Sequence, residues 1–124
     1  MPELPEVQTI VDELRPHLLG RAFTGLEADW TPALATGTLD QFRARLIGQR
    51  ILDVQRRGKY VVLFLSGGDT LLIHLMMTGR LSVLPGSGPC DRHTHVRFLL
   101  EDGQELRFRD VRKLGRTYLV GDTE

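Results

Sequence analysis

Apolar residues at helical spacing open the chain. They recur every three or four positions, which places their side chains on one face of an α-helix. These positions are Val7, Ile10, Val11, Leu14 and Leu18. Pro5 suits a first helical turn, where its missing N–H costs nothing, and Gly20 suits a C-terminal stop. The pattern therefore predicts a helix over residues 5–19.

A second, shorter helix is predicted after a loop at residues 31–37. Thr38 and Gln41 have the spacing of a capping box, in which each side chain bonds the backbone of the other residue. Gly48 closes the segment. The apolar positions of this helix are Leu39, Phe42, Leu46 and Ile47.

The rest of the chain has the pattern of short strands. The predicted strands cover residues 22–29, 50–56, 59–65, 70–75, 80–84, 95–100, 105–109 and 117–120. Glycine-containing turns separate most of them, among them Asp102-Gly103, a tight-hairpin sequence. Residues 85–89 form a longer surface loop. We therefore predict a mainly β (α+β) fold, an antiparallel β-sandwich or flattened barrel flanked by two helices.

Length and composition limit the class of protein. At 124 residues the chain forms one domain with a core of its own. Its start does not resemble a signal peptide, and no apolar run reaches membrane-spanning length. The single cysteine, Cys90, excludes an internal disulfide and a cysteine-rich zinc cluster within the chain. We expect a cytoplasmic protein, monomeric, with no membrane partner.

Charge is balanced in total but uneven along the chain, with 16 basic and 16 acidic residues. Residues 1–13 carry four acids and no base, whereas residues 43–59 carry six bases and one acid. Residues 107–116 carry five bases and one acid. Such segments are usually solvated surface, but two of them beside an acidic terminus also fit a phosphate-binding face.

The first six residues, Met-Pro-Glu-Leu-Pro-Glu, combine a potential nucleophile with acids. Removal of Met1 would expose the secondary amine of Pro2, and an α-amine titrates near pH 8 (about 7.7–8.0), so part of it is neutral at neutral pH. Amines attack carbonyl carbons and form Schiff bases, and a proline can stop only at a cationic iminium. The same residues also fit a capped helix start with acids matched to the dipole.

Three later stretches place cations and methionines at turns: RRGKY at 56–60, HLMMTGR at 74–80 and RDVRKLG at 109–115. Taken singly, each fits a solvated turn or half-buried packing. Together with PELPEV at 2–7 and HTHV at 93–96, they resemble the N-terminal domain of the formamidopyrimidine-DNA glycosylases, in family order and over all 124 residues.

The resemblance implies a bifunctional glycosylase and abasic-site (AP) lyase of base-excision DNA repair. It implies that a damaged purine, such as 8-oxoguanine or a formamidopyrimidine, is flipped out of double-stranded DNA. The Pro2 amine then attacks the sugar C1′, expels the base and leaves a Schiff base, after which β- and δ-elimination cut the strand. No cofactor is expected in this chain.

Site residues follow from the same resemblance. The implied catalytic residues are Pro2, Glu3 as the general acid and Lys59 as the proton donor for β-elimination, with Glu6 as possible support. The implied DNA-binding residues are His74, Met77, His93, Arg112, Lys113 and Leu114. Met77 is a flexible apolar wedge, and Arg112 can bond the orphaned partner base. No metal ligand is implied among these residues.

The sequence departs from the family pattern in the third loop. Val111, Lys113 and Leu114 stand where the family usually has proline, arginine and phenylalanine, so Leu114 lacks the aromatic ring that the family pattern supplies for stacking. Lys113 keeps a charge but loses the bidentate fork of arginine.

Two alternatives stay open. One is an endonuclease VIII-like enzyme for oxidised pyrimidines, against which Leu4 and HLMMTG argue. The other is a non-catalytic DNA-binding domain. The family's helix–two-turns–helix and zinc-finger domains, with their zinc, have no counterpart in residues 1–124, so we expect the isolated fragment to be weak or inactive.

Overall fold

A computed structural model describes residues 4–121 and shows two helices, a 3₁₀ turn and eight strands in that range. The helical elements are α1 (Leu4–Leu18), η1 (Thr31–Ala33) and α2 (Leu39–Leu46). The strands are β1 (Phe23–Ala28), β2 (Ile51–Arg57), β3 (Tyr60–Leu65), β4 (Thr70–His74), β5 (Gly79–Pro85), β6 (Thr94–Leu100), β7 (Gln104–Asp110) and β8 (Arg116–Val120). Pro2 and Glu3 lie outside the described residues.

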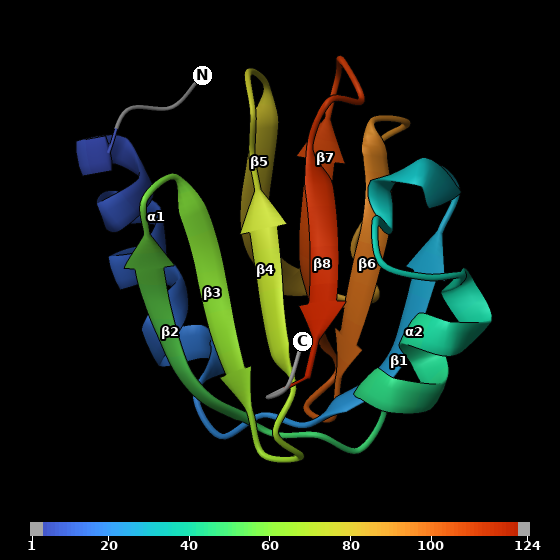
Figure 1. The fold of residues 1–124 in the computed structure, drawn as a ribbon. Coiled ribbons are helices and arrows are strands. Elements are labelled where there is room, and N and C mark those ends of the chain that lie inside the picture. Colours follow the sequence, from blue (N-terminus) through green and yellow to red (C-terminus); the bar gives the residue numbers. More distant parts are fainter. Residues whose placement is uncertain (1–3, 122–124) are drawn as a thin grey trace.

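Two four-stranded antiparallel sheets face each other (Figure 1). One has the order β1-β6-β7-β5 and the other β2-β3-β4-β8. The chain passes from one sheet to the other after β1, after β4 and after β7, and the last two crossings are made by short loops. The mainly β sandwich flanked by two helices is therefore confirmed.

Helices cover the two open sides of the sandwich (Figure 1). α1 packs against β2, β3 and β5, and α2 packs against β1. The apolar face of α1 that the sequence predicts is buried at Val7, Val11, Leu14 and Leu18. The helix continues through Pro16. Arg15 donates two hydrogen bonds to the Val54 carbonyl on the outer edge of β2.

The capping box of α2 is present, with Thr38 and Gln41 bonding each other's backbone at 3.1 and 2.8 Å. The segment before it is more ordered than the predicted loop. Residues 31–33 form a 3₁₀ turn, and Leu34 forms a parallel bridge with Thr117 on the edge of β8. The reason is a set of side-chain bonds to β8, including Thr117 Oγ1 to the Ala33 carbonyl at 2.9 Å.

None of the helices in residues 4–121 is long and apolar enough to cross a membrane.

Candidate functional site

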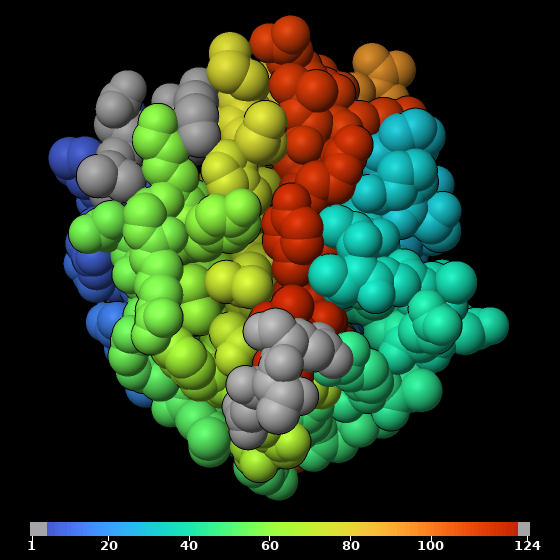
Figure 2. Space-filling view, viewed as in Figure 1, coloured from blue at the N-terminus to red at the C-terminus, as the bar shows by residue number. Residues whose placement is uncertain are grey.

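The predicted site residues that the structure describes gather at one end of the sandwich, here called the loop end (Figure 1). It comprises the β2–β3 turn (58–59), the β4–β5 loop (75–78), the residues before β6 (91–93), the β7–β8 loop (111–115) and the start of α1. The opposite end, here called the turn end, carries the turns at 47–50, 66–69 and 101–103. Figure 2 shows the β4–β5 and β7–β8 loops side by side at the top of the molecule.

A buried carboxylate, Asp110, holds these two loops together. Its Oδ1 accepts hydrogen bonds from the Thr78 hydroxyl and from the Arg112 N–H at 3.2 Å. Its Oδ2 accepts from the Gly115 N–H at 2.6 Å. The Arg112 N–H also lies 3.2 Å from Thr78 Oγ1. Because Asp110 is only 3% exposed, its carboxylate is largely shielded from water, and leaving its hydrogen bonds unmade would be expensive.

Two glycines let the same loops approach the core. A Cβ on Gly115 would come within 2.9 Å of the His74 carbonyl and would overlap the Phe108 ring. A Cβ on Gly79 would overlap the same ring and the Leu75 backbone. Only hydrogen fits at either position, so RDVRKLG and HLMMTG both end in glycine for a steric reason.

Backbone conformation presents the predicted wedge residues outward. Met76 and Lys113 have φ of 54° and 57°, left-handed values that non-glycine residues rarely adopt. The Met76 N–H donates to His74 Nδ1 at 3.1 Å, which supports that turn. Met77 follows with 47% of its surface exposed. Arg112 is exposed, whereas Leu114 is half-buried.

His74 and Lys59 are neighbours across the sheet. Tyr60 of β3 pairs with His74 of β4, and their rings meet edge to face at 4.7 Å. Lys59 precedes Tyr60 at the turn. Burial of the imidazole, together with the Lys59 charge, lowers the pKa of His74 below its ordinary value of 6.5. His74 is therefore neutral at pH 7 in the protein without DNA.

His93 is positioned by an aspartate rather than by a strand. Asp91 Oδ1 accepts from the His93 N–H at 2.7 Å, and Asp91 Oδ2 accepts from Arg109 Nε at 2.7 Å. The Arg109 hydrogen bond is the largest cause that lowers the pKa of Asp91. The His93 carbonyl in turn accepts from the Asp110 N–H at 2.9 Å, which connects this segment to β7.

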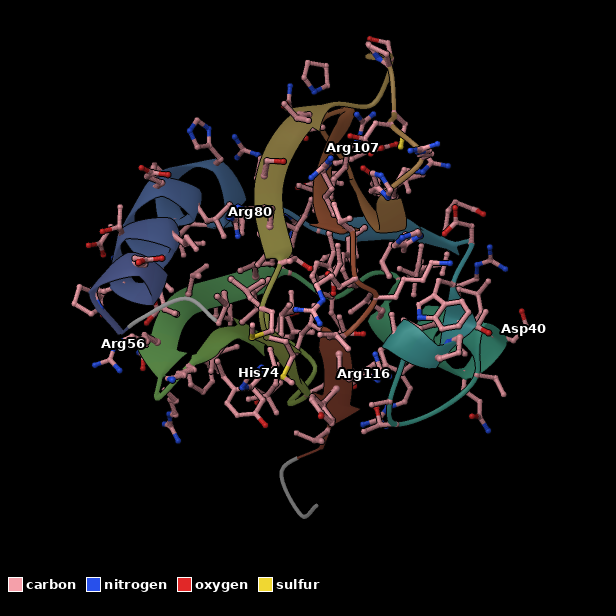
Figure 3. The ribbon with its side chains drawn as sticks, turned by 90° about the horizontal axis from the view of Figure 1, so that it is seen from above. Asp40, Arg56, His74, Arg80, Arg107 and Arg116 are labelled. Carbon is pink, nitrogen blue, oxygen red and sulfur yellow. The ribbon has the colours of Figure 1, made fainter. Side chains whose placement is uncertain are left out.

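The start of α1 borders an open hollow lined by Glu6, Thr9, Ile10 and Arg80. Figure 3, viewed from the loop end, shows Arg80 between α1 and β5. Glu6 is exposed in the first turn of α1. Among the described residues, no group of three or more His, Cys, Asp or Glu side chains could hold a metal ion.

The two basic segments do not form one continuous face, which corrects the simplest interpretation of the charge pattern. Arg107 is 3% exposed and bonds Glu105 and three carbonyls of the 85–89 loop. Arg45 and Arg50 lie at the turn end and pair with Asp69 and Glu101. Only part of each segment therefore contributes to the loop end.

Comparison with known proteins gives the family. The profile described as Formamidopyrimidine-DNA glycosylase N-terminal domain matches residues 1–117 of the 124. The chain belongs to this family. The resemblance stated from the motifs is thereby confirmed.

Relatives and solved structures agree. The formamidopyrimidine-DNA glycosylases of Desulforamulus reducens and Protochlamydia amoebophila are 45% and 43% identical over 125 aligned residues. Both alignments cover 100% of this chain but 45% of the relative, so the chain spans less than half the length of these glycosylases. The Lactococcus lactis glycosylase, solved non-covalently bound to DNA containing an AP site, superposes with a TM-score of 0.91. That match is 32% identical and covers 98% of this chain and 46% of the other.

Sequence reasoning missed the residues that position the site. Asp110, Thr78 and Asp91 were not singled out, although Asp110 was counted as the lone acid in a basic segment. An acid at a strand end, inside a run of cations and close to glycine, is the signal that could have identified Asp110. The roles assigned to the individual site residues stay predictions.

Proposed function

We propose that this chain is the N-terminal catalytic part of a DNA glycosylase that removes oxidised purines such as 8-oxoguanine and formamidopyrimidines. Its membership of the glycosylase family supports this proposal. The observation that carries it is the gathering of Lys59, His74, Met77 and Arg112 at the end where α1 begins. This arrangement suits chemistry at the N-terminus beside a nucleic acid held by loops.

The reaction would begin at the Pro2 amine once Met1 has been removed. The amine attacks C1′ of the damaged nucleotide, and the C1′–base bond breaks as the new N–C1′ bond forms. Glu3 would protonate the sugar ring oxygen, which opens the ring and leaves a cationic iminium. The iminium acidifies the C2′ hydrogen, so loss of that proton expels the 3′ phosphate, and a second elimination expels the 5′ phosphate. This AP lyase step is part of the proposal.

The loops would hold the DNA open around that chemistry. Met77 is an exposed, flexible apolar side chain, which suits a wedge between base steps. Arg112 projects from a loop that Asp110 fixes to Thr78, which suits a group filling the space of a flipped nucleotide. Lys59, His74, His93 and Lys113 would contact the backbone, and Leu114, half-buried, would contribute less than an exposed aromatic wedge.

The remaining expectations belong to the same proposal. Because the chain spans about 45% of its relatives' length, we expect a second region to supply much of the DNA grip and a zinc site. The protein would act as a monomer on damaged double-stranded DNA in a bacterial cytoplasm, at the nucleoid. The 124 residues alone would bind DNA weakly and excise little.

Borohydride trapping on DNA containing an abasic site tests the catalytic proposal. Mass spectrometry first establishes whether the chain begins at Pro2. The abasic sugar needs no base excision, so even a weakly bound chain should form a covalent adduct, and Pro2→Gly should abolish or greatly reduce that adduct. A chain that begins at Pro2 but gives no adduct at saturating DNA would contradict the proposal and favour a non-catalytic DNA-binding domain. Faster excision of oxidised pyrimidines than of 8-oxoguanine, by a chain that includes the proposed second region, would favour the endonuclease VIII alternative.

A further inference from the structure

A small cavity lies beside the β7–β8 loop. It has about 10 Å³ of space for a water-sized sphere, which is the lower limit for holding one water molecule. Its lining comes from three parts of the chain: the segment after β1, the start of β6 and the β7–β8 region. The lining residues are Trp30, Ala33, His95, Phe108, Asp110, Lys113 and Gly115.

Two polar atoms in this lining lack a protein partner. Trp30 Nε1 and His95 Nε2 are both buried, and neither has a hydrogen-bond partner within residues 4–121. His95 itself is only 7% exposed. A buried polar group without a partner costs free energy, so two such atoms in one cavity point to a shared ligand.

The chemistry of the two atoms is complementary. An indole N–H can only donate. His95 Nδ1 lies 2.8 Å from Asp29 Oδ1, and because a carboxylate only accepts, Nδ1 carries the proton. In the tautomer with a single proton on Nδ1, Nε2 is an acceptor. A donor and an acceptor on two residues that line one cavity suit a molecule that both accepts and donates.

A third partner is available on Asp110. Two carboxylate oxygens offer about four acceptor sites. Thr78 and Arg112 use two on Oδ1, and Gly115 uses one on Oδ2, so one site remains on Oδ2. Buried waters typically make about three hydrogen bonds, which is the number that Trp30, His95 and Asp110 provide together.

We propose that this cavity binds one water molecule, which accepts from Trp30 Nε1 and donates to His95 Nε2 and Asp110 Oδ2. The water links β6 and the segment after β1 to the carboxylate that fixes the β7–β8 loop. Trp30 is thereby a positioning residue on two counts, because Lys113 Nζ also lies 4.5 Å from its ring centre. The proposal concerns the folded chain and does not depend on glycosylase activity.

NMR tests the water directly. Trp30 is the only tryptophan, so ¹⁵N-labelled protein gives one indole N–H signal. We expect a cross-peak between that proton and the water resonance. Lys113→Met is the control, because exchange of the nearby ammonium protons could relay such a peak. A peak that persists in this variant supports a bound water. A peak that is absent from the wild type, or lost in the variant, overturns it.

Stability gives a second test with a definite sign. Replacing Trp30 by benzothienylalanine exchanges the indole N–H for sulfur in a ring of similar shape, and no other residue is affected. If a water molecule accepts a hydrogen bond from the N–H, the equilibrium constant for unfolding in urea should rise about three- to tenfold. This change is the equivalent of one neutral hydrogen bond. An unchanged or lower unfolding constant would mean that the N–H has no partner to lose, and would overturn the proposal. Circular dichroism follows unfolding here, since the indole reporter is gone.

Discussion

The two ends of the sandwich use similar residues in different ways. At the turn end, three arginines pair with acids: Arg21 with Asp102 at 2.6 Å, Arg50 with Glu101 at 2.6 Å and Arg45 with Asp69 at 2.8 Å. These pairs join segments that are distant in sequence. The Arg45 hydrogen bond is the largest cause that lowers the pKa of Asp69, and the Arg50 hydrogen bond has that role for Glu101.

At the loop end, the one buried acid is used by backbone instead. Asp110 accepts from two chain N–H groups and a hydroxyl, and no arginine or lysine pairs with it among residues 4–121. Arg112, Lys113 and Arg116 form no ion pair with a carboxylate of the described residues. The three turn-end arginines are therefore paired with acids. At the loop end Arg109 pairs with Asp91, but these three loop-end cations have no acidic partner among the described residues.

Removing the buried acid should give the largest difference in stability between the two ends. Asp110→Ala leaves the Thr78 hydroxyl and two chain N–H groups without their acceptor, so we expect a loss of about 3 kcal/mol in the free energy of unfolding. Urea unfolding followed by Trp30 fluorescence measures this loss. Asp102→Ala is the turn-end control, since it also removes a carboxylate that accepts one cation and one chain N–H. Its exposure should limit the loss to about 1 kcal/mol. Equal losses would mean that the loops are not held by Asp110.

Two glycine-to-alanine substitutions, one at each end, test how tightly the chain is packed there. Gly115→Ala drives a methyl group against Phe108 and to 3.0 Å from Asp110 Oδ2, so we expect about 2–3 kcal/mol of destabilisation from overpacking. Gly67→Ala at the turn end meets only the Gln49 side chain, at 2.7 Å. That amide can rotate away, so the cost should stay near 1 kcal/mol, mostly from the lost bond to the Gly67 N–H. A larger cost at Gly67 than at Gly115 would contradict this assignment.

The sequence predicted most of the fold because local signals were strong. The capping box at Thr38 and Gln41, the Asp102-Gly103 hairpin and the two-residue period of the strands each specify structure within a few residues. The 3₁₀ turn at residues 31–33 was missed because tertiary bonds to Thr117, distant in sequence, stabilise it.

The candidate site was predicted in its outward-facing residues but not in its supports. Side chains such as Met77 and Arg112 belong to motifs that can be recognised in the sequence, whereas Asp110 acts through chain N–H groups that leave no trace in residue type. Charge counting failed for a related reason. Arg107 and Arg112 look equivalent in the sequence, yet one is buried against Glu105 and the other is exposed.

Salt dependence distinguishes the ends by function. Each phosphate contact adds about −0.9 to the slope of log affinity against log salt. Arg112→Ala and Lys113→Ala should each flatten that slope by up to about 0.9 for duplex DNA containing an abasic site. Arg50→Ala at the turn end should leave it unchanged, because its guanidinium is paired with Glu101. Fluorescence anisotropy over a salt series measures the slopes. A slope that falls as much for Arg50→Ala would place DNA at the wrong end of the sandwich.

The smallest effect concerns pH at His74. Burial and the Lys59 charge hold its pKa below 6.5, so the unfolded chain takes up this proton before the folded chain does. The His74 contribution to stability therefore falls as pH drops below about 6.5.

A DNA phosphate beside the ring would favour the imidazolium, so the complex would bind more protons than the free protein. DNA affinity should then rise as pH falls, by up to about tenfold per unit of pKa difference. His74→Asn keeps an acceptor for the Met76 N–H but cannot titrate, and it should reduce both pH dependences. His17→Asn, in the last turn of α1 away from the loop end, should leave the pH dependence of DNA binding unchanged. If His74→Asn retains the full pH dependence of DNA binding, the proton is taken up elsewhere and His74 does not contact phosphate.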